Sequence, residues 1–229
     1  MEASRLVALL HLSSPALPIG GFSYSQGFEA AAELRLVSDE PTAEQWIIDQ
    51  LELVIAQCEA PMWTLLFDCW SKGNWAGIDY WNTWFNASRE TLEMRRETEQ
   101  MGWSLARLAT DLNWGTVQAQ SHLLGQESIT LPTSHSYCIQ ALGIGKHAGL
   151  AAYVFLWLEN QVAAAIKTIP LGQMAGQRIL DRVRPRIPAV VEQALSRAGG
   201  VPPELRTLAP QFSILSSRHE TQYSRLFRS

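Results

Sequence analysis

The sequence GLAAYVFLWL, residues Gly149–Leu158, is the longest apolar stretch of the chain. Three polar residues, Glu159–Gln161, separate it from a second apolar run, Val162–Ile166. A membrane-spanning helix needs roughly 20 mostly apolar residues, and here the three polar residues would lie near its centre. The stretch therefore predicts a buried central helix of a globular protein and not a membrane segment.

Most of the remaining chain also predicts helices. Ile47, Leu51 and Val54, for example, recur at the spacing of one helix face. Pro61 predicts the start of a new helix, because proline is tolerated in the first turn and not in the interior. The fragment Ile129–Leu131 is the one place where a strand is conceivable, and it is too short to indicate a sheet.

Charged residues follow one another in the segment that precedes Met101. Arg89 and Glu93 are four residues apart, as are Arg95 and Glu99. Such pairs support the solvated face of a helix. We therefore expect this part of the helix to face water.

No internal repeat, low-complexity segment or change in composition marks a domain boundary in the 229 residues. Hydrophobic residues make up 47% of the chain and charged residues 17%, which is typical of a globular soluble protein. We predict an all-α fold, a single compact multi-helix domain of roughly eight to ten helices spanning residues 1–229. A flexible C-terminal docking tail, residues 212–229, is expected to end it.

Net charge and cysteine content narrow the class of protein. A net charge of −4 argues against a nucleic-acid binder, which needs a basic surface. Three scattered cysteines do not form a disulfide framework and favour a reducing compartment such as the cytoplasm. The N-terminal sequence MEASRLVALLHL has no small-residue cleavage site, so it predicts a first helix and not a signal peptide.

The segment Leu12–Glu29, LSSPALPIGGFSYSQGFE, combines prolines, glycines and hydroxyl residues in a way that packing alone rarely requires. Within it Gly21–Ser25 resembles the G-x-S-x-G nucleophile elbow, but the fifth residue is Ser25 and prolines stand where a strand should precede. A serine hydrolase using Ser23 is therefore a distant alternative. We interpret the segment as the rigid start of a helix that places three side chains for structure or for a partner: Tyr24, Gln26 and Glu29.

Neither a nucleotide nor a metal site is indicated. Gly143–Ala148 matches G-x-G-x-x-A, but no strand precedes it, and His147 replaces the Ser or Thr of a phosphate loop. A close crossing of helices at these glycines is the better interpretation. The five histidines show no ligand spacing, and no two cysteines lie close together. We predict no cofactor, no metal ligand and no catalytic residue.

Three features are candidates for interaction surfaces. Six of the nine tryptophans lie between Trp46 and Trp84, which suits a packed core better than an interface. Small residues four apart in Gly172–Arg178 allow either an internal helix crossing or a partner contact through exposed amides. The chain end carries apolar residues at helical spacing, surrounded by arginines, and is a candidate docking segment. Its residues of interest are His219, Tyr223, Arg225, Leu226, Phe227 and Arg228.

Four segments together resemble the UreF family of urease accessory proteins. They are SPALPIGGFSYSQGFE at residues 14–29, RRETEQMG at 95–102, PLGQ-x-x-GQR at 170–178 and HETQYSRLFRS at 219–229. The matches occur in the same order as in the family and cover essentially the whole chain. One departure is Phe28, where the family's Gly-Leu-Glu would have leucine.

The resemblance implies an all-helical, cytoplasmic, non-enzymatic protein that forms homodimers. It also implies a chaperone role in nickel insertion. Together with an accessory protein of the UreD (also called UreH) family, such a protein recruits the GTPase UreG, which carries nickel to the urease apoprotein. Neither nucleic acid nor membrane is an expected partner.

The resemblance also suggests which residues meet these partners. The tail would contact the UreD protein together with the helix that carries Gln173, Gln177 and Arg178. The segment that carries Ser23, Tyr24, Gln26 and Glu29 would form part of a partner or GTPase surface. A GTPase-activating role, with Arg178 or Arg228 as an arginine finger, is the alternative.

Overall fold

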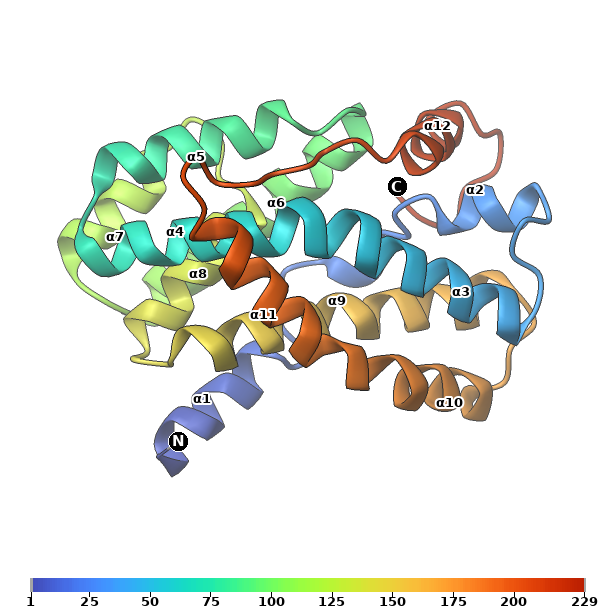
Figure 1. Cartoon of the computed structure of the whole chain (residues 1–229), viewed down its shortest axis with the longest axis horizontal. Coiled ribbons are helices and arrows are strands. Elements are labelled where there is room, and N and C mark those ends of the chain that lie inside the picture. Colours follow the sequence, from blue (N-terminus) through green and yellow to red (C-terminus); the bar gives the residue numbers. More distant parts are fainter. Residues whose placement is uncertain (1, 229) are drawn as a thin grey trace.

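The computed structural model describes residues 2–228 and contains helices and loops but no strand within that range (Figure 1). Its α-helices are α1 (Ala3–Leu12), α2 (Phe28–Glu33), α3 (Glu40–Gln50), α4 (Ala60–Lys72), α5 (Trp75–Ala87), α6 (Leu92–Asp111), α7 (Val117–Leu124), α8 (Leu131–Ala141), α9 (Lys146–Thr168), α10 (Gln173–Val183), α11 (Ile187–Ala198) and α12 (Pro210–His219). The chain also forms a 3-10 turn η1 (Gly21–Ser23), a π-helix η2 (Leu51–Glu59) and a 3-10 turn η3 (Arg184–Arg186).

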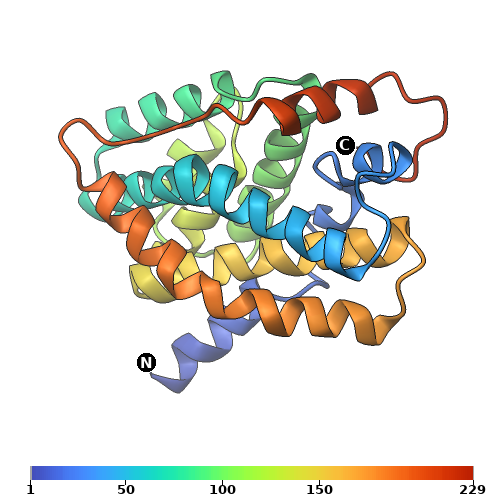
Figure 2. The same ribbon diagram turned by 45° about the vertical axis from the view of Figure 1, so that its right-hand side comes forward.

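The all-α prediction is confirmed. Because α3, η2 and α4 follow one another without a break, as do α10, η3 and α11, the twelve α-helices of the described chain form ten continuous rods. The conceivable strand at Ile129–Leu131 is instead a loop that leads into α8. N-terminal α1 projects from the body, and the chain end lies beside α2 (Figures 1 and 2).

Helix α9 is the central helix, as its apolar sequence predicts. It packs against α1, α2, α3, α4, α8, α10 and α11, and Leu150, Val154 and Leu158 are fully buried. Its length and composition would suit a membrane span, but 61% of its most apolar window is buried inside the protein. The helix crossing expected at Gly143 and Gly145 is wrong: Gly145 has open space where a Cβ would stand, and Gly143 is a left-handed residue (φ +65°) just after α8. The close approach of α8 and α9 is instead at Gly149, which lies against Ile139.

Pro61 lies in the first turn of α4, as predicted, although α4 continues directly from η2 without a loop. Proline cannot donate a hydrogen bond to the carbonyl four residues earlier, and its ring crowds that carbonyl. Here that group is Gln57 O, which accepts instead from Arg206 N at 3.0 Å. The rod widens into η2 just before Pro61 and continues as α4. Arg206 belongs to an extended strap, residues 199–209, that joins α11 to α12 (Figure 1).

The solvated face expected near the start of α6 is a second incorrect prediction. Arg89 lies before the helix, so it is not on one helix face with Glu93. Glu93 is buried, and Glu99 accepts from Asn86 and Ser128. This end of α6 is covered by α5 and by the C-terminal segment. Spacing alone cannot show that another part of the chain covers a helix face.

Several tryptophans are buried in the core, as the packed-core interpretation predicts. Trp46, Trp63, Trp70 and Trp157 are buried in the main core. Trp103 on α6 is exposed. Within the cluster from Trp46 to Trp84, core packing therefore explains the three buried tryptophans, Trp46, Trp63 and Trp70.

Candidate functional site

The chain from Gly20 to Glu29 turns twice before it becomes α2. Gly20 has φ +81° and precedes η1, and the next turn places Gln26 at φ +53° and Gly27 at φ +80°. Glycine adopts such angles at little cost, whereas a residue with a side chain rarely does. An unfavourable conformation at Gln26 therefore needs support from its surroundings.

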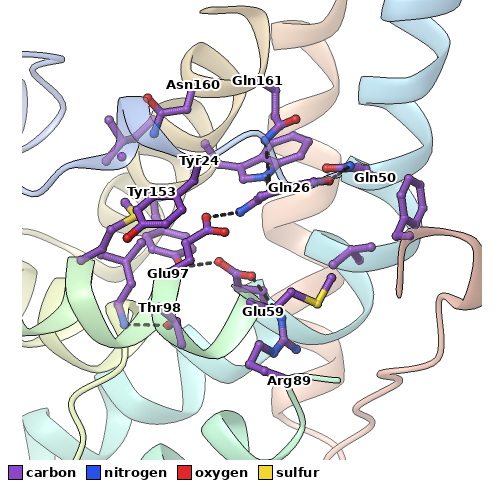
Figure 3. A pocket seen from close by; sticks show the side chains of 18 of the residues that line it. Tyr24, Gln26, Gln50, Glu59, Arg89, Glu97, Thr98, Tyr153, Asn160 and Gln161 are labelled. Carbon is purple, nitrogen blue, oxygen red and sulfur yellow. Dashed lines mark hydrogen bonds and ion pairs between the residues drawn. The ribbon is translucent and has the colours of Figure 1, made fainter. Parts of the chain in front are cut away.

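That support comes from hydrogen bonds to the Gln26 amide and carbonyl (Figure 3). Its Nε2 donates to Glu97 Oε1 at 2.7 Å. Its Oε1 accepts from Trp157 Nε1 at 2.7 Å and from Gln161 Nε2 at 3.2 Å. Its backbone oxygen accepts from Gln50 Nε2 at 2.9 Å. We call Gln26 and these four partners, from α3, α6 and α9, the Gln26 hub.

The hub forms one wall of a cavity of about 70 Å³ between the N-terminal segment, η2, α6 and α9 (Figure 3). A buried water needs about 10–15 Å³ measured in this way, so several fit. Two buried atoms at this cavity, Gln161 Oε1 and Arg89 Nε, find no partner among residues 2–228. Since buried polar atoms are normally hydrogen-bonded, water in the cavity would complete their bonding.

The cavity is polar on the side of η2 and α9. The Tyr153 hydroxyl donates to Glu59 Oε1, and burial, followed by the charge of Glu59, raises the pKa of Tyr153 well above its usual value. Arg89 Nη1 lies 3.7 Å from Glu59 Oε2. On the opposite side, burial and then Glu97 raise the pKa of Tyr24. Both tyrosines therefore keep their hydroxyl hydrogens and act as donors at neutral pH.

Beyond the hub, Glu29 binds the chain end. Its Oε1 accepts from Leu226 N at 2.7 Å, and its Oε2 accepts from Phe227 N at 2.9 Å. The same Oε2 lies 3.0 Å from Nε2 of His219. One buried carboxylate near the N-terminus thus binds three groups that lie about 190 residues later in the chain.

Glu93 completes this arrangement from α6. Its Oε2 lies 2.9 Å from His219 Nδ1, and its Oε1 accepts from Arg225 Nη1 at 2.9 Å. Each ring nitrogen of His219 faces a carboxylate oxygen, so a ring with a hydrogen on each nitrogen would donate to both carboxylates. Arg225 and such a ring balance the two carboxylates. We call Glu29, Glu93, His219 and Arg225, with the Leu226 and Phe227 amides, the C-terminal latch.

Two further contacts join the N-terminal segment to the tail. Gln100 Oε1 accepts from both the Tyr24 hydroxyl and Arg228 Nη1, while Arg228 N donates to Ser23 O at 2.8 Å. Lys167 Nζ lies 5.6 Å from the ring centres of both Phe22 and Phe227. The N-terminal signature and the chain end therefore form one continuous face of the protein.

The latch buries some tail residues and exposes others. His219 and Phe227 are buried, Leu226 is largely exposed, and Tyr223 is fully exposed. Arg225 and Arg228 are exposed beside them. The tail thus presents two large exposed side chains beside two arginines, a composition typical of the contact residues of an interface.

The structure brings two of the three predicted partner segments together. Ser23 and Glu29 bond to the tail, Tyr24 shares Gln100 with it, and Gln26 lies between them in the chain. Tyr24 and Glu29 are buried and Gln26 is half-buried, so their bonds are internal. Helix α10 lies on a separate face, where Gln173 and Gln177 are exposed. The latch binds the tail to Glu29 and Glu93 as far as Phe227. That the tail is flexible in solution stays a prediction.

Helix α10 is fixed in two ways. Gly176 packs on Ile166 of α9, so this glycine serves an internal crossing, whereas Gly172 has open space where a Cβ would stand. Arg178 and Arg182 both bind Glu40 of α3, and their hydrogen bonds lower the pKa of Glu40 to about 2. As a candidate arginine finger, Arg178 is thus already engaged by a carboxylate, and Arg228 by Gln100.

The arrangement offers little for other chemistry. Ser23 ends a 3-10 turn instead of following a strand, so the elbow geometry is not formed. From residue 2 to residue 228, no three His, Cys, Asp or Glu side chains are grouped to hold a metal ion. Burial raises the pKa of the Cys58 thiol to about 11, which disfavours the thiolate that binds metals.

Sequence reasoning missed Glu93, Glu97 and Gln100 as site residues. Glu97 and Gln100 lie in the segment 95–102 that resembles the family, so this resemblance could have indicated both as site residues. Glu93 precedes it and was assigned to a solvated pair. Nothing in its local sequence shows that His219 and Arg225 meet it.

Comparisons with known proteins point to one family. The UreF family model matches residues 37–184. The urease accessory protein UreF of Bordetella parapertussis is 59% identical over 220 residues, covering 96% of this chain and 100% of that protein. That of Cupriavidus taiwanensis is 56% identical over 225 residues, covering 98% of each.

A fusion protein is also similar. The bifunctional urease accessory protein UreEF of Bordetella bronchiseptica is 58% identical over 229 residues. The match covers all of this chain and 53% of that protein.

Proposed function

Because the chain belongs to the UreF family of urease accessory proteins, we propose that it is a cytoplasmic scaffold for urease maturation. It binds an accessory protein of the UreD (UreH) family, and the pair recruits the GTPase UreG for nickel insertion into the urease apoprotein. The chain itself supplies binding surfaces and not catalysis. The absence of a grouped metal site within residues 2–228 is compatible with nickel being carried by its partners.

The observation that carries this proposal is the face made by the N-terminal segment and the C-terminal latch. Proteins rarely bury two carboxylates without a reason beyond stability, since desolvation of the charges offsets much of the attraction. Here the cluster fixes a chain end that would otherwise fray. Fixing Tyr223 and Leu226 in advance reduces the entropy lost when a partner binds.

A pull-down with a purified UreD-family protein tests the face. Truncation after Ser217 would remove His219 and leave Glu29 and Glu93 buried without a partner, so a loss of binding could reflect misfolding. The double substitution Tyr223→Ala and Leu226→Ala changes only exposed side chains. It should weaken binding at least tenfold, since exposed aromatic and apolar anchors dominate interfaces.

The matched control lies on the strap. Val201 and Leu208 are as exposed as the two tail residues, and Val201→Ala with Leu208→Ala should leave binding unchanged. Equal binding by the tail variant and the wild-type chain would refute the assignment of this face.

We further propose that the chain forms homodimers through α1. This helix projects from the body and exposes Leu6, Val7 and Leu10 (Figures 1 and 2). An apolar stripe on a projecting helix is expected to pair with another surface. Light scattering on the purified chain would show twice the monomer mass, and Leu10→Glu should reduce it to that of a monomer.

A further inference from the structure

We propose that Gln26 is a positioning residue: it sets the shape of the partner face from inside the protein and is not itself a partner contact. The inference rests on the proposed function only for what the face binds. Its structural part, that Gln26 controls the position of the chain end, is independent of any partner.

The backbone at Gln26 is the first reason. A φ of +53° followed by +80° at Gly27 makes two consecutive left-handed residues, a conformation that is unfavourable for any residue with a Cβ atom. Asparagine or glycine would be the usual choice at such a position. The presence of a longer amide therefore indicates that its side chain is needed.

The bonding of that side chain is the second reason. The amide donates to Glu97 and accepts from Trp157 and Gln161. An acid in its place would lack the donor, and a lysine or arginine would lack the acceptor. An asparagine would be one methylene too short to reach α6 and α9 together. The site thus fits glutamine by both chemistry and length.

The position of Gln26 between two tail contacts is the third reason. Two residues before it, Tyr24 shares Gln100 with Arg228. Three residues after it, Glu29 binds the amides of Leu226 and Phe227. A change in the turn at Gln26 therefore moves both attachment points of the tail, although none of the hydrogen bonds of Gln26 is to a tail residue between His219 and Arg228.

A charge swap tests this chain of contacts. Gln26→Glu puts a second carboxylate 2.7 Å from that of Glu97, and two carboxylates so close repel when both are ionised. Adding Glu97→Gln restores one amide and one carboxylate, with donor and acceptor exchanged. Gln26→Asn, a milder variant that tolerates the left-handed conformation, shows whether the length of the side chain matters.

Two readouts are taken on the full chain at pH 7. The first is hydrogen exchange of the Leu226 and Phe227 amides, which needs no partner. The second is affinity for the purified UreD-family protein. Gln26→Glu should raise both exchange rates and weaken binding at least tenfold, and the double variant should recover both. Gln26→Asn should give intermediate values, while Gln118→Glu, an exposed amide on α7, should change neither.

Each other outcome overturns the inference. Unchanged tail exchange in Gln26→Glu would show that Gln26 does not position the tail. Recovery of exchange without recovery of binding in the double variant would make Gln26 a direct contact. Failure of the proposed function is recognised separately, because the Tyr223 and Leu226 substitutions would then leave binding unchanged. Hydrogen exchange of the tail amides would still test whether Gln26 positions the tail.

Discussion

Two regions of this protein each enclose a histidine that is 0% exposed, yet they treat it in opposite ways. His135 on α8 lies among aromatic rings and accepts from Trp63 Nε1 at 3.0 Å. Burial lowers its pKa to about 3, so the ring is neutral. His219 lies instead between the carboxylates of Glu29 and Glu93, with a carboxylate oxygen 2.9 Å from Nδ1 and another 3.0 Å from Nε2.

The difference teaches that burial alone does not define the role of a polar residue. Around His135 the neighbours are apolar, and the region contributes packing. Around His219 the neighbours are charged, and the region joins segments that are far apart in the sequence. The charged region forms the proposed partner face, while the apolar one keeps the helices together.

Loss of the ring in the charged region should have the largest effect. His219→Ala leaves Glu29 and Glu93 buried without their shared partner, and breaking a buried ion pair in this way costs about 3–5 kcal/mol. Urea denaturation followed by circular dichroism would measure the free energy of unfolding. The matched control is His147→Ala, on the surface beside Glu192, which should change it by less than about 0.5 kcal/mol. Similar losses in the two variants would show that the latch carries little energy.

Acid should affect the apolar region gradually, as the pH is lowered. Below pH 6.5 the unfolded chain protonates His135, whereas the folded chain does not until about pH 3. The free energy of unfolding therefore decreases as the pH is lowered across this window, by up to about 1.4 kcal/mol per pH unit from this residue. His135→Gln, whose Oε1 can still accept from Trp63, should remove this component. Denaturation curves collected from pH 7 to pH 4 would compare the two chains, and parallel pH profiles would contradict the assignment.

An exposed ion pair should have the smallest effect. Arg178 and Glu40 lie at the surface, where water and salt screen them. The pKa of Glu40 is lowered to about 2, so any stabilisation is present above pH 4.5 and is lost as the pH falls toward 2. At pH 7 and 150 mM salt, Arg178→Ala should leave the calorimetric unfolding temperature within error of the wild type. A shift close to that of His219→Ala would mean that burial is not the deciding factor.

Much of the fold could be predicted because helices are encoded locally. The run Gly149–Leu158 predicted the central helix α9, and regular spacing predicted most others. Pro61 begins α4 as predicted, but the helical rod does not break there, because of a solution that the pattern did not show: η2 widens, and Arg206 N from the strap donates to the free carbonyl of Gln57. That solution depends on a residue about 150 positions away, which no local pattern reveals.

The candidate site was predicted in part. Family-like segments indicated both Glu29 and the tail, but not that one binds the other. Glu93 was assigned to a solvated helix face, although it is the second carboxylate of the latch. Gln26 was expected at a partner surface, and it bonds to the interior instead. In each case the sequence drew attention to the residue but did not show which other residue it binds.

The sequence by itself determined the all-helical architecture, the central place of α9 and the family of the protein. These properties depend on residue order over a few helical turns, where spacing alone decides which side chains share a face. Only the tertiary structure decided which polar residues are buried and with whom. The pairing of Glu29 with His219 depends on the path of the whole intervening chain, and electrostatic energy is set by distance in space and not along the sequence.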